Sequence, residues 1–302
     1  MDGDTNLVIR AAYASELPSL VAALDEQFIF QRGRRHSLAD RFPGLFDQTN
    51  LPNIFVAAAA SSILSALAVR RFDWIEHGTA WKGAMIGAVY TNPAHRKLGI
   101  ASKVLQYAAD CLKENGVDFA LLWTAQPAFY ARLGWIAADS GMLGELAGND
   151  MRDSTQHVAV SPTAEANIEL IETIRQRHLE TYRARRPDDY RALPIPADFA
   201  QTYACHDAAG AAYALTGVAD DAVFVYEIVG DEMAYAALLQ AIGKSRHRIM
   251  INDAANTPSQ QWLTRHTRIE WQDKPLAMWL PLSPQIDESH FSNWYVPYFD
   301  RI

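Results

Sequence analysis

The sequence predicts a protein of the α/β (α+β) class with mixed sheets, divided into two domains of similar layout. The chain has 302 residues, which at roughly 150 residues per domain suggests about two domains. Segments with helical and strand-like hydrophobic spacing alternate along both halves. A strand, a helix and a second strand also follow one another in each half, an order that implies a right-handed parallel crossover. We expect one domain over residues 1–162 and the other over 163–302.

Composition excludes several classes of protein. Hydrophobic residues make up 49% and charged residues 21%, as in ordinary globular chains. The net charge of −8 argues against non-specific binding to nucleic acid or to an anionic membrane. The two cysteines, Cys111 and Cys205, form neither a disulfide framework nor a zinc cluster, and we expect no metal site. No signal peptide and no apolar stretch of about 20 residues is visible, so we expect a cytoplasmic protein.

Caps and turn residues delimit the elements of the first half. Ser15 precedes helically spaced leucines as an N-cap, and Pro43 ends a short helix that follows. Asn92 and Pro93 end a strand, and Gly116 closes a longer helix. The expected strands are 7–10, 53–59, 63–72, 81–91 and 119–124, and helices are expected after Ser15 and at 37–42, 100–115 and 127–133.

The second half repeats this layout after a small, polar stretch at 140–163. We expect 156–160 to be the last strand of the first sheet, with the domain boundary near Pro162. A long amphipathic helix is expected at 163–186. Further strands are expected at 202–206, 211–218, 222–229, 248–251 and 276–282, and helices at 231–242 and 259–266. The order of elements indicates a diverged internal duplication, in which Gly230 and Asp231 replace the whole loop 92–99 of the first half.

The loop between residues 91 and 100 carries the chemistry. A strand runs into Arg96, Lys97 and Gly99, and the loop opens directly into a helix. Backbone N–H groups and the helix dipole make such an N-terminus an anion site. Gly99 allows close approach of a phosphate, and Ala101 keeps the first turn uncrowded. On spacing alone, a phosphate or pyrophosphate site and an ordinary basic loop are equally supported.

Two ordered motifs resemble those of the GNAT superfamily of acyl-CoA N-acyltransferases. The segment 96–101 is similar to the family's Arg/Gln-x-x-Gly-x-Gly/Ala signature, and 129–135 resembles its Phe-Tyr-x-x-x-Gly-Phe segment. The pairing of a unit that has these motifs with a degenerate unit is similar to tandem enzymes and to the first two domains of enhanced-intracellular-survival acetyltransferases. The chain is too short for the sterol-carrier-like third domain of the latter.

The resemblance implies roles for individual residues. The backbone of the strand end should bond the pantetheine arm of CoA, and the loop amides should cradle its pyrophosphate. Tyr130 stands where the family has a general acid, and a phenol with a reference pKa of about 10 suits protonation of a departing thiolate. The alternative for Tyr130 is a packed aromatic side chain. The expected cofactor-binding residues are Val89, Tyr90, Thr91, Arg96, Lys97, Leu98, Gly99, Ile100 and Ala101.

The general base is harder to locate, because the central strand at 83–90 contains no Asp or Glu. The alternatives are a water chain or one of four side chains, each more typical of a solvated surface group. An aromatic tail at 291–299, which leads to the end of the chain, offers another candidate for the base. In the related multidomain enzymes a C-terminal carboxylate reaches the active site, so Ile302 is a candidate catalytic residue. The tail could instead clamp the domains together. The side-chain candidates for the base are Asp73, Glu76, His77 and Glu26, and the candidates for an acceptor pocket are Phe28, Phe30 and Trp74.

The function that the resemblance implies is transfer of an acetyl group from acetyl-CoA directly to a primary amine of a small molecule, peptide or protein. The alternative is a non-catalytic, regulatory acyl-CoA-binding module. Acetyl-CoA, as co-substrate, and the amine acceptor are the expected partners, and nucleic acid and membranes are not. A homodimer is a candidate assembly.

Overall fold

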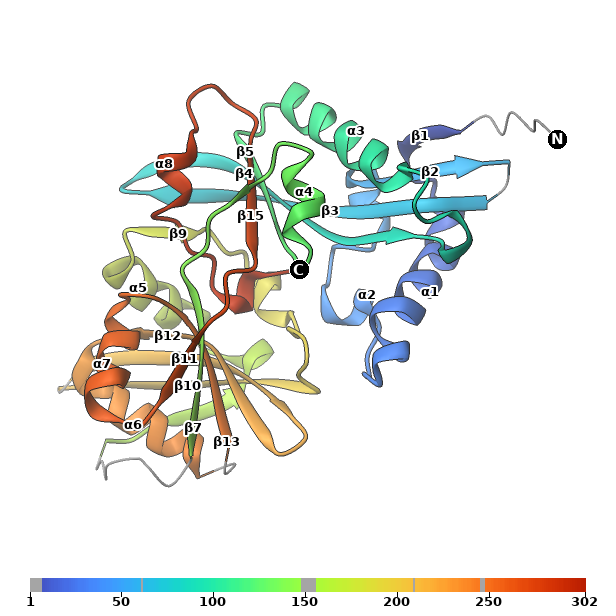
Figure 1. Ribbon diagram of the computed structural model, residues 1–302. Coiled ribbons are helices and arrows are strands. Elements are labelled where there is room, and N and C mark those ends of the chain that lie inside the picture. Colours follow the sequence, from blue (N-terminus) through green and yellow to red (C-terminus); the bar gives the residue numbers. More distant parts are fainter. Residues whose placement is uncertain (1–6, 61, 148–155, 209, 245–247) are drawn as a thin grey trace.

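Two mixed β-sheets, each with helices packed on it, form the body of the protein (Figure 1). The computed structural model describes residues 7–60, 62–147, 156–208, 210–244 and 248–302. Within these residues, no helix is both long enough and apolar enough to cross a membrane. The predicted class, α/β with two mixed sheets, is confirmed.

The first sheet has the strand order β1-β2-β3-β4-β5-β15-β6, and β9 pairs with β3 at one end. Neighbours on this path are antiparallel except for β4 and β5, which are parallel and are connected by the predicted crossover helix. The strands are β1 Val8–Ala11, β2 Ile54–Ala59, β3 Ser62–Glu76, β4 Thr79–Thr91, β5 Phe119–Trp123, β6 Ile136–Ala137, β9 Thr181–Arg183 and β15 Ala277–Pro281.

The second sheet repeats the path of the first sheet but has no counterpart of β9. Its order is β8-β10-β11-β12-β13-β7-β14, and the parallel pair β12 and β13 occupies the same position as β4 and β5. The repeat in element order along the sequence therefore corresponds to a repeat in space. The strands are β7 Gly141–Ala147, β8 Ala159–Pro162, β10 Phe199–Asp207, β11 Gly210–Ala219, β12 Ala222–Gly230, β13 Arg248–Ala254 and β14 Glu270–Asp273.

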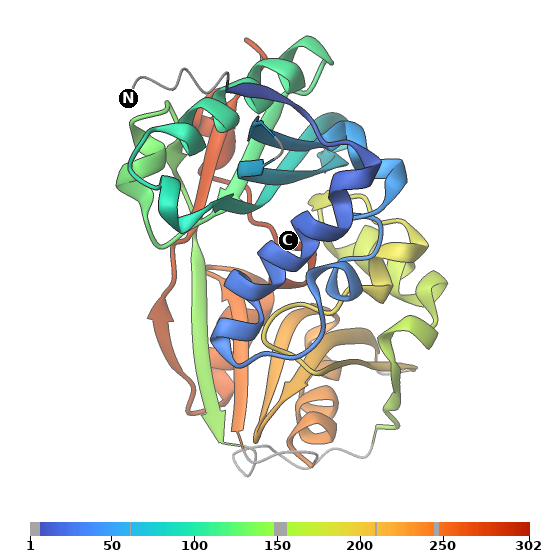
Figure 2. The same cartoon turned by 90° about the vertical axis from the view of Figure 1, so that its right-hand side faces the viewer.

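Each half lends one strand to the other half. β7 leaves the first half and lies between β13 and β14, whereas β15 returns from the end of the chain to lie between β5 and β6 (Figures 1 and 2). The strands therefore do not divide between the sheets at residue 162. The prediction that 156–160 completes the first sheet is wrong, because β8 pairs with β10 through partners such as Val160 and Tyr203.

Helices cover the faces of both sheets, and most begin where the sequence predicts. Ser37 caps α2, where its side chain accepts a hydrogen bond from the amide of Asp40. The long helix predicted at 163–186 is wrong: α5 ends at His178, and the chain then extends as β9 to pair with β3. Here tertiary pairing overrides the local pattern. The helices are α1 Leu17–Phe28, α2 Leu38–Arg41, α3 Ile100–Glu114, α4 Pro127–Ala131, α5 Ile168–His178, α6 Glu232–Gly243, α7 Pro258–His266 and α8 Glu288–Phe291.

The aromatic tail clamps the two halves together. Trp294 is buried against Phe119, Trp279 and Phe291, and its indole N–H donates to Glu76 Oε1 at 2.6 Å. Farther along, the buried carboxylate of Asp300 accepts hydrogen bonds from two arginines, Arg183 and Arg185. The chain then ends between the two sheets (Figure 1).

Candidate active site

The site begins at an irregularity in β4. The register between β3 and β4 shifts between Ala66 and Ala68, and Ala88 takes a left-handed conformation with φ of 52°. A β-bulge of this kind redirects the strand. β4 pairs with β5 only from Gly83 to Met85, so its last residues, 86–91, have no strand partner on that side within the described residues. The backbone groups that face that side can pair with an extended ligand.

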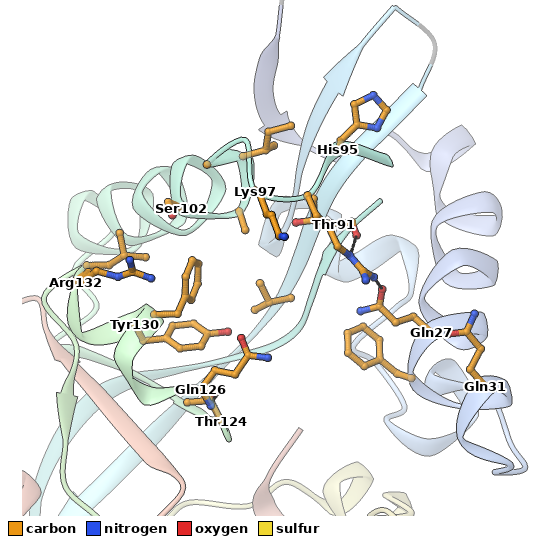
Figure 3. Close-up of a pocket in the computed structure, with 18 of the residues that line it drawn as sticks. Gln27, Gln31, Thr91, His95, Lys97, Ser102, Thr124, Gln126, Tyr130 and Arg132 are labelled. Atoms are coloured by element: carbon orange, nitrogen blue, oxygen red, sulfur yellow. Dashed lines mark hydrogen bonds between the residues drawn. The ribbon is translucent and has the colours of Figure 1, made fainter. Parts of the chain in front are cut away.

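A cavity of about 1180 Å³ occupies the opening between the separated strands. Its walls are formed by β4, the loop after it, the start of α3, the α4 region, and the end of α1 with the turn that follows (Figure 3). Its lining contains four basic side chains, those of Arg32, Arg96, Lys97 and Arg132, and no Asp or Glu among the described residues. The cavity is therefore suited to an anionic ligand.

The predicted anion loop has the geometry of a helix N-terminus. A 3₁₀ turn, η4 Pro93–His95, leads to Lys97 and Gly99, whose φ angles of 65° and 74° are left-handed. Gly99 adopts this conformation at little steric penalty and directly precedes α3, so the first amides of α3 lack intrahelical acceptors. Arg96 donates to the Thr91 carbonyl oxygen at 3.2 Å and to Gln27 Oε1 at 2.8 Å, which bridges the loop to α1 (Figure 3).

Tyr130 combines burial with access to the cavity. Its ring packs edge-on against Phe129 and Trp135, and its hydroxyl points into the cavity beside Gln126 (Figure 3). Burial raises the pKa of Tyr130 to about 12. The hydroxyl therefore stays protonated at neutral pH and is available as a proton donor.

A smaller cavity of about 120 Å³ adjoins the large one at the bulge of β4. Phe28 and Arg32 line both cavities, while Val89 faces the larger and Ala88 the smaller. The last residue of the chain also lies here. A Cβ added to Gly87 would come within 3.0 Å of Ile302 Cγ1 and 3.3 Å of its carboxyl carbon. The remaining lining residues of the smaller cavity are Arg34, Leu38, Phe42, Leu45, Phe46, Ile195 and Ile302.

The structure brings most of the predicted site residues together. Val89, Thr91 and Tyr130 line the large cavity, as do most residues of the anion loop. The side chain of Tyr90 is buried in the core under α1, and that of Leu98 is 65% exposed, so neither lines the cavity. The loop residues that line it are Arg96, Lys97, Gly99, Ile100 and Ala101.

The four side chains considered as bases lie elsewhere, since none lines either cavity. Asp73 pairs with Lys82 at 2.6 Å, and Glu76 accepts hydrogen bonds from two tryptophans. His77 is exposed beside Glu180, and Glu26 accepts from Gln31 on the surface. Of the three aromatic candidates for an acceptor pocket, only Phe28 lines either cavity. Trp74 is fully buried in the core, and Phe30 is 54% exposed on the surface.

Several lining residues were not predicted. Gln27, Gln31 and Arg32 come from the end of α1 and the turn after it, and Arg132 follows α4. In the sequence, they resemble ordinary solvated side chains at helix ends. The one signal in the sequence was the proximity of Arg132 to Tyr130 within the second motif.

The part of the chain that forms this site is similar to a known family of proteins. Residues 8–138 match the family model described as an acetyltransferase (GNAT) domain. The first half of the chain is a GNAT domain. No curated protein matches the chain in sequence. The family model thus describes an acetyltransferase domain for this part of the chain.

Several solved structures are similar in fold to nearly the whole chain. A GCN5-related N-acetyltransferase from Anabaena variabilis is 16% identical, with a TM-score of 0.71 over 92% of this chain and 73% of its own. Eis1 from Mycobacterium abscessus is 15% identical, with a TM-score of 0.63 over 91% and 74%. A tandem GNAT protein from the clavulanic acid biosynthesis pathway is 12% identical, with a TM-score of 0.55 over 92% and 99%. The chain thus has the tandem GNAT fold.

Proposed function

We propose that the protein transfers an acetyl group from acetyl-CoA directly to a primary amine, with the donor in the large cavity of the GNAT domain. The observation that carries the proposal is the basic cavity between the separated strands β4 and β5, which has the amides of the anion loop at one end and Tyr130 on its wall. The pyrophosphate would bind the amides of 96–101, with Arg96 and Lys97 adding charge. The pantetheine arm would pair with the backbone of 89–91.

The reaction is a direct acyl transfer. The neutral amine attacks the thioester carbonyl carbon, and backbone N–H groups at the bulge of β4 stabilise the developing oxyanion. The C–S bond then breaks, and Tyr130 protonates the leaving thiolate. We assign the removal of the amine proton to the terminal carboxylate of Ile302, which lies against Gly87 of β4, beside the bulge.

The second domain would bind no acyl-CoA. Gly230 and Asp231 lead directly into α6, so no loop surrounds the helix N-terminus, and Asp231 places a negative charge there. Asp231 Oδ2 accepts a hydrogen bond from the amide of Ala211 at 2.8 Å. A carboxylate at this position repels a phosphate.

A second candidate function is a regulatory module that binds acyl-CoA without turnover. It is favoured by one observation: no Asp or Glu among the described residues lines either cavity. The two functions differ in whether thiol is released.

Thiol release from acetyl-CoA, measured over a panel of primary amines, tests the proposed function. We expect amine-dependent release and a loss of about 100-fold in kcat for Tyr130→Phe, with KM for acetyl-CoA little changed. Tyr107→Phe, on the outer part of α3, is the matched control. Binding of acetyl-CoA without release on any amine would reject catalysis in favour of the regulatory module.

A further inference from the structure

Two arginines that line the smaller cavity have few partners within the fold. Arg32 and Arg34 flank Gly33, whose left-handed φ of 66° ends the 3₁₀ turn η2 Phe30–Arg32. Neither guanidinium forms an ion pair with any carboxylate of the described residues. Arg32 lies 5.6 Å from the centre of the Phe28 ring, and Arg34 donates one long hydrogen bond of 3.5 Å to the Phe28 carbonyl oxygen.

Arg41, a few residues farther along, shows what a structural arginine looks like in this segment. It is fully buried, and its guanidinium donates to four backbone carbonyl oxygens, those of Arg35, His36, Leu193 and Ala197. Arg41 therefore fastens α2 to the second half of the chain. Arg32 and Arg34 have no comparable acceptors and remain available to a ligand.

The two free guanidiniums also repel one another. Burial, and then the neighbouring charge of Arg32, lower the pKa of Arg34. Arg32 is exposed and Arg34 is half-buried, and an anion in contact with both guanidiniums would relieve their repulsion. A carboxylate would satisfy both, because guanidinium and carboxylate groups form short, charge-assisted hydrogen bonds.

The remaining side chains that line the cavity are apolar. Phe42, Leu45, Phe46 and Ile195 form much of its wall, and Ala88 places it beside the site of transfer. Its volume of about 120 Å³ equals roughly four water molecules of the liquid, enough for one side-chain-sized group.

We infer that the acceptor is a small amine that carries both a carboxylate and an apolar side chain, as an apolar α-amino acid does. Its carboxylate would bind Arg32 and Arg34, its side chain would fill the apolar wall, and its amine would face the bulge at Ala88. This inference rests on the proposed function, since it names the acceptor of that reaction. The same two arginines would repel a polycationic amine, so they also set specificity.

Calorimetric binding in the presence of coenzyme A tests this inference without requiring turnover. The probes are L-leucine, L-leucinamide and 3-methylbutylamine, which share one apolar group and one amine but differ in the carboxylate. We expect L-leucine to bind at least about tenfold more tightly than the other two. The double variant Arg32→Gln with Arg34→Gln should remove this preference, while Arg35→Gln, an exposed arginine of the same segment, should keep it.

The outcomes separate this inference from the function on which it rests. Equal affinity for the three probes, or no binding of L-leucine, L-methionine or L-phenylalanine, would overturn the inference even if other amines are acetylated. Loss of acetyl-CoA binding in the double variant would also overturn it, because the arginines would then serve the donor. Binding of L-leucine without turnover would support the amino-acid site at Arg32 and Arg34 but reject the proposed catalysis.

Discussion

The buried ion cluster around Asp300 should be essential for holding the tail in place. Asp300 is 1% exposed and accepts three hydrogen bonds, from Arg183 Nη1 at 2.9 Å and from Arg185 Nε and Nη2 at 2.7 and 2.9 Å. Arg183 lies on β9, which pairs with the first sheet, so the cluster joins the tail to both halves. Asp300→Asn keeps the shape of the side chain but removes the charge that both guanidiniums face.

The expected loss of stability depends on the ion pairs that remain after the substitution. Removing one partner of a buried ion pair costs about 3–5 kcal/mol. Arg183 still faces Asp189 and Arg185 still faces Glu227, so we expect the lower end, about 3 kcal/mol. With a slope of about 3 kcal/mol per molar urea, the unfolding midpoint should fall by about 1 M.

The pH dependence of this difference has a definite sign. Burial alone would raise the pKa of Asp300, but the charges of Arg185 and Arg183 hold it well below its usual range. The stability that Asp300 contributes is therefore present above its unfolded pKa of about 4 and is lost as the pH falls through its lower folded pKa. The gap between the wild type and Asp300→Asn should persist from pH 7 to pH 4 and shrink only in stronger acid.

Urea unfolding followed by tryptophan fluorescence measures this effect. Asp188→Asn is the matched control, because Asp188 pairs with Arg191 on the surface, with side chains 77% and 66% exposed. Exposed ion pairs contribute little, so its midpoint should stay at the wild-type value. A midpoint for Asp300→Asn that equals that of the control would refute the claim that the cluster fixes the tail.

Three further predictions concern other parts of the molecule. Gly87→Val should lower kcat with little change in KM for acetyl-CoA, because the Cβ atom alone would come within 3.0 Å of Ile302 Cγ1 and displace the chain end. An unchanged kcat would argue against a catalytic role for the chain end. Burial raises the pKa of Asp253 to about 6, above its value in the unfolded chain. The free energy of unfolding should therefore fall as the pH rises from about 4 to about 6, where the carboxyl ionises in the unfolded chain but stays protonated in the folded one. Asp253→Asn should flatten that decline in unfolding curves measured across this pH range. Gly99→Asp should abolish the thermal stabilisation by acetyl-CoA, whereas Gly116→Asp, which also has a left-handed φ but lies at the far end of α3, should retain it.

The sequence predicted most of the elements and the anion loop, because these depend on local signals. Ser37 and Gly99 delimit helices through capping and left-handed turns, and the hydrophobic spacing of α3 defines the face that it buries. The role proposed for the loop rests on the backbone of one short segment. No knowledge of distant residues is needed for such features.

The exchange of strands between the sheets could not be predicted in the same way. β7 and β15 are short strands with mixed burial, and either would fit the same slot beside a parallel strand. The choice depends on long-range pairing, for example Met278 with Leu122 and Met250 with Glu145. The same reason explains why β9 appeared as part of a helix.

The smaller cavity is also a tertiary feature. Arg32 and Arg34 look like solvated charges in the sequence, and their neighbours Phe42 and Phe46 look like ordinary core residues. Only the folded chain sets these side chains beside Ala88 and Ile195, from opposite halves of the sequence.

A crystal structure of the protein with bound coenzyme A tests the central claim most directly. We expect one coenzyme A per chain, with its pyrophosphate on the amides of 96–101, its pantetheine arm along 89–91 and its sulfur near the Tyr130 hydroxyl. Coenzyme A bound at the β12 and β13 opening of the second domain, or with its pyrophosphate away from the anion loop, would contradict it.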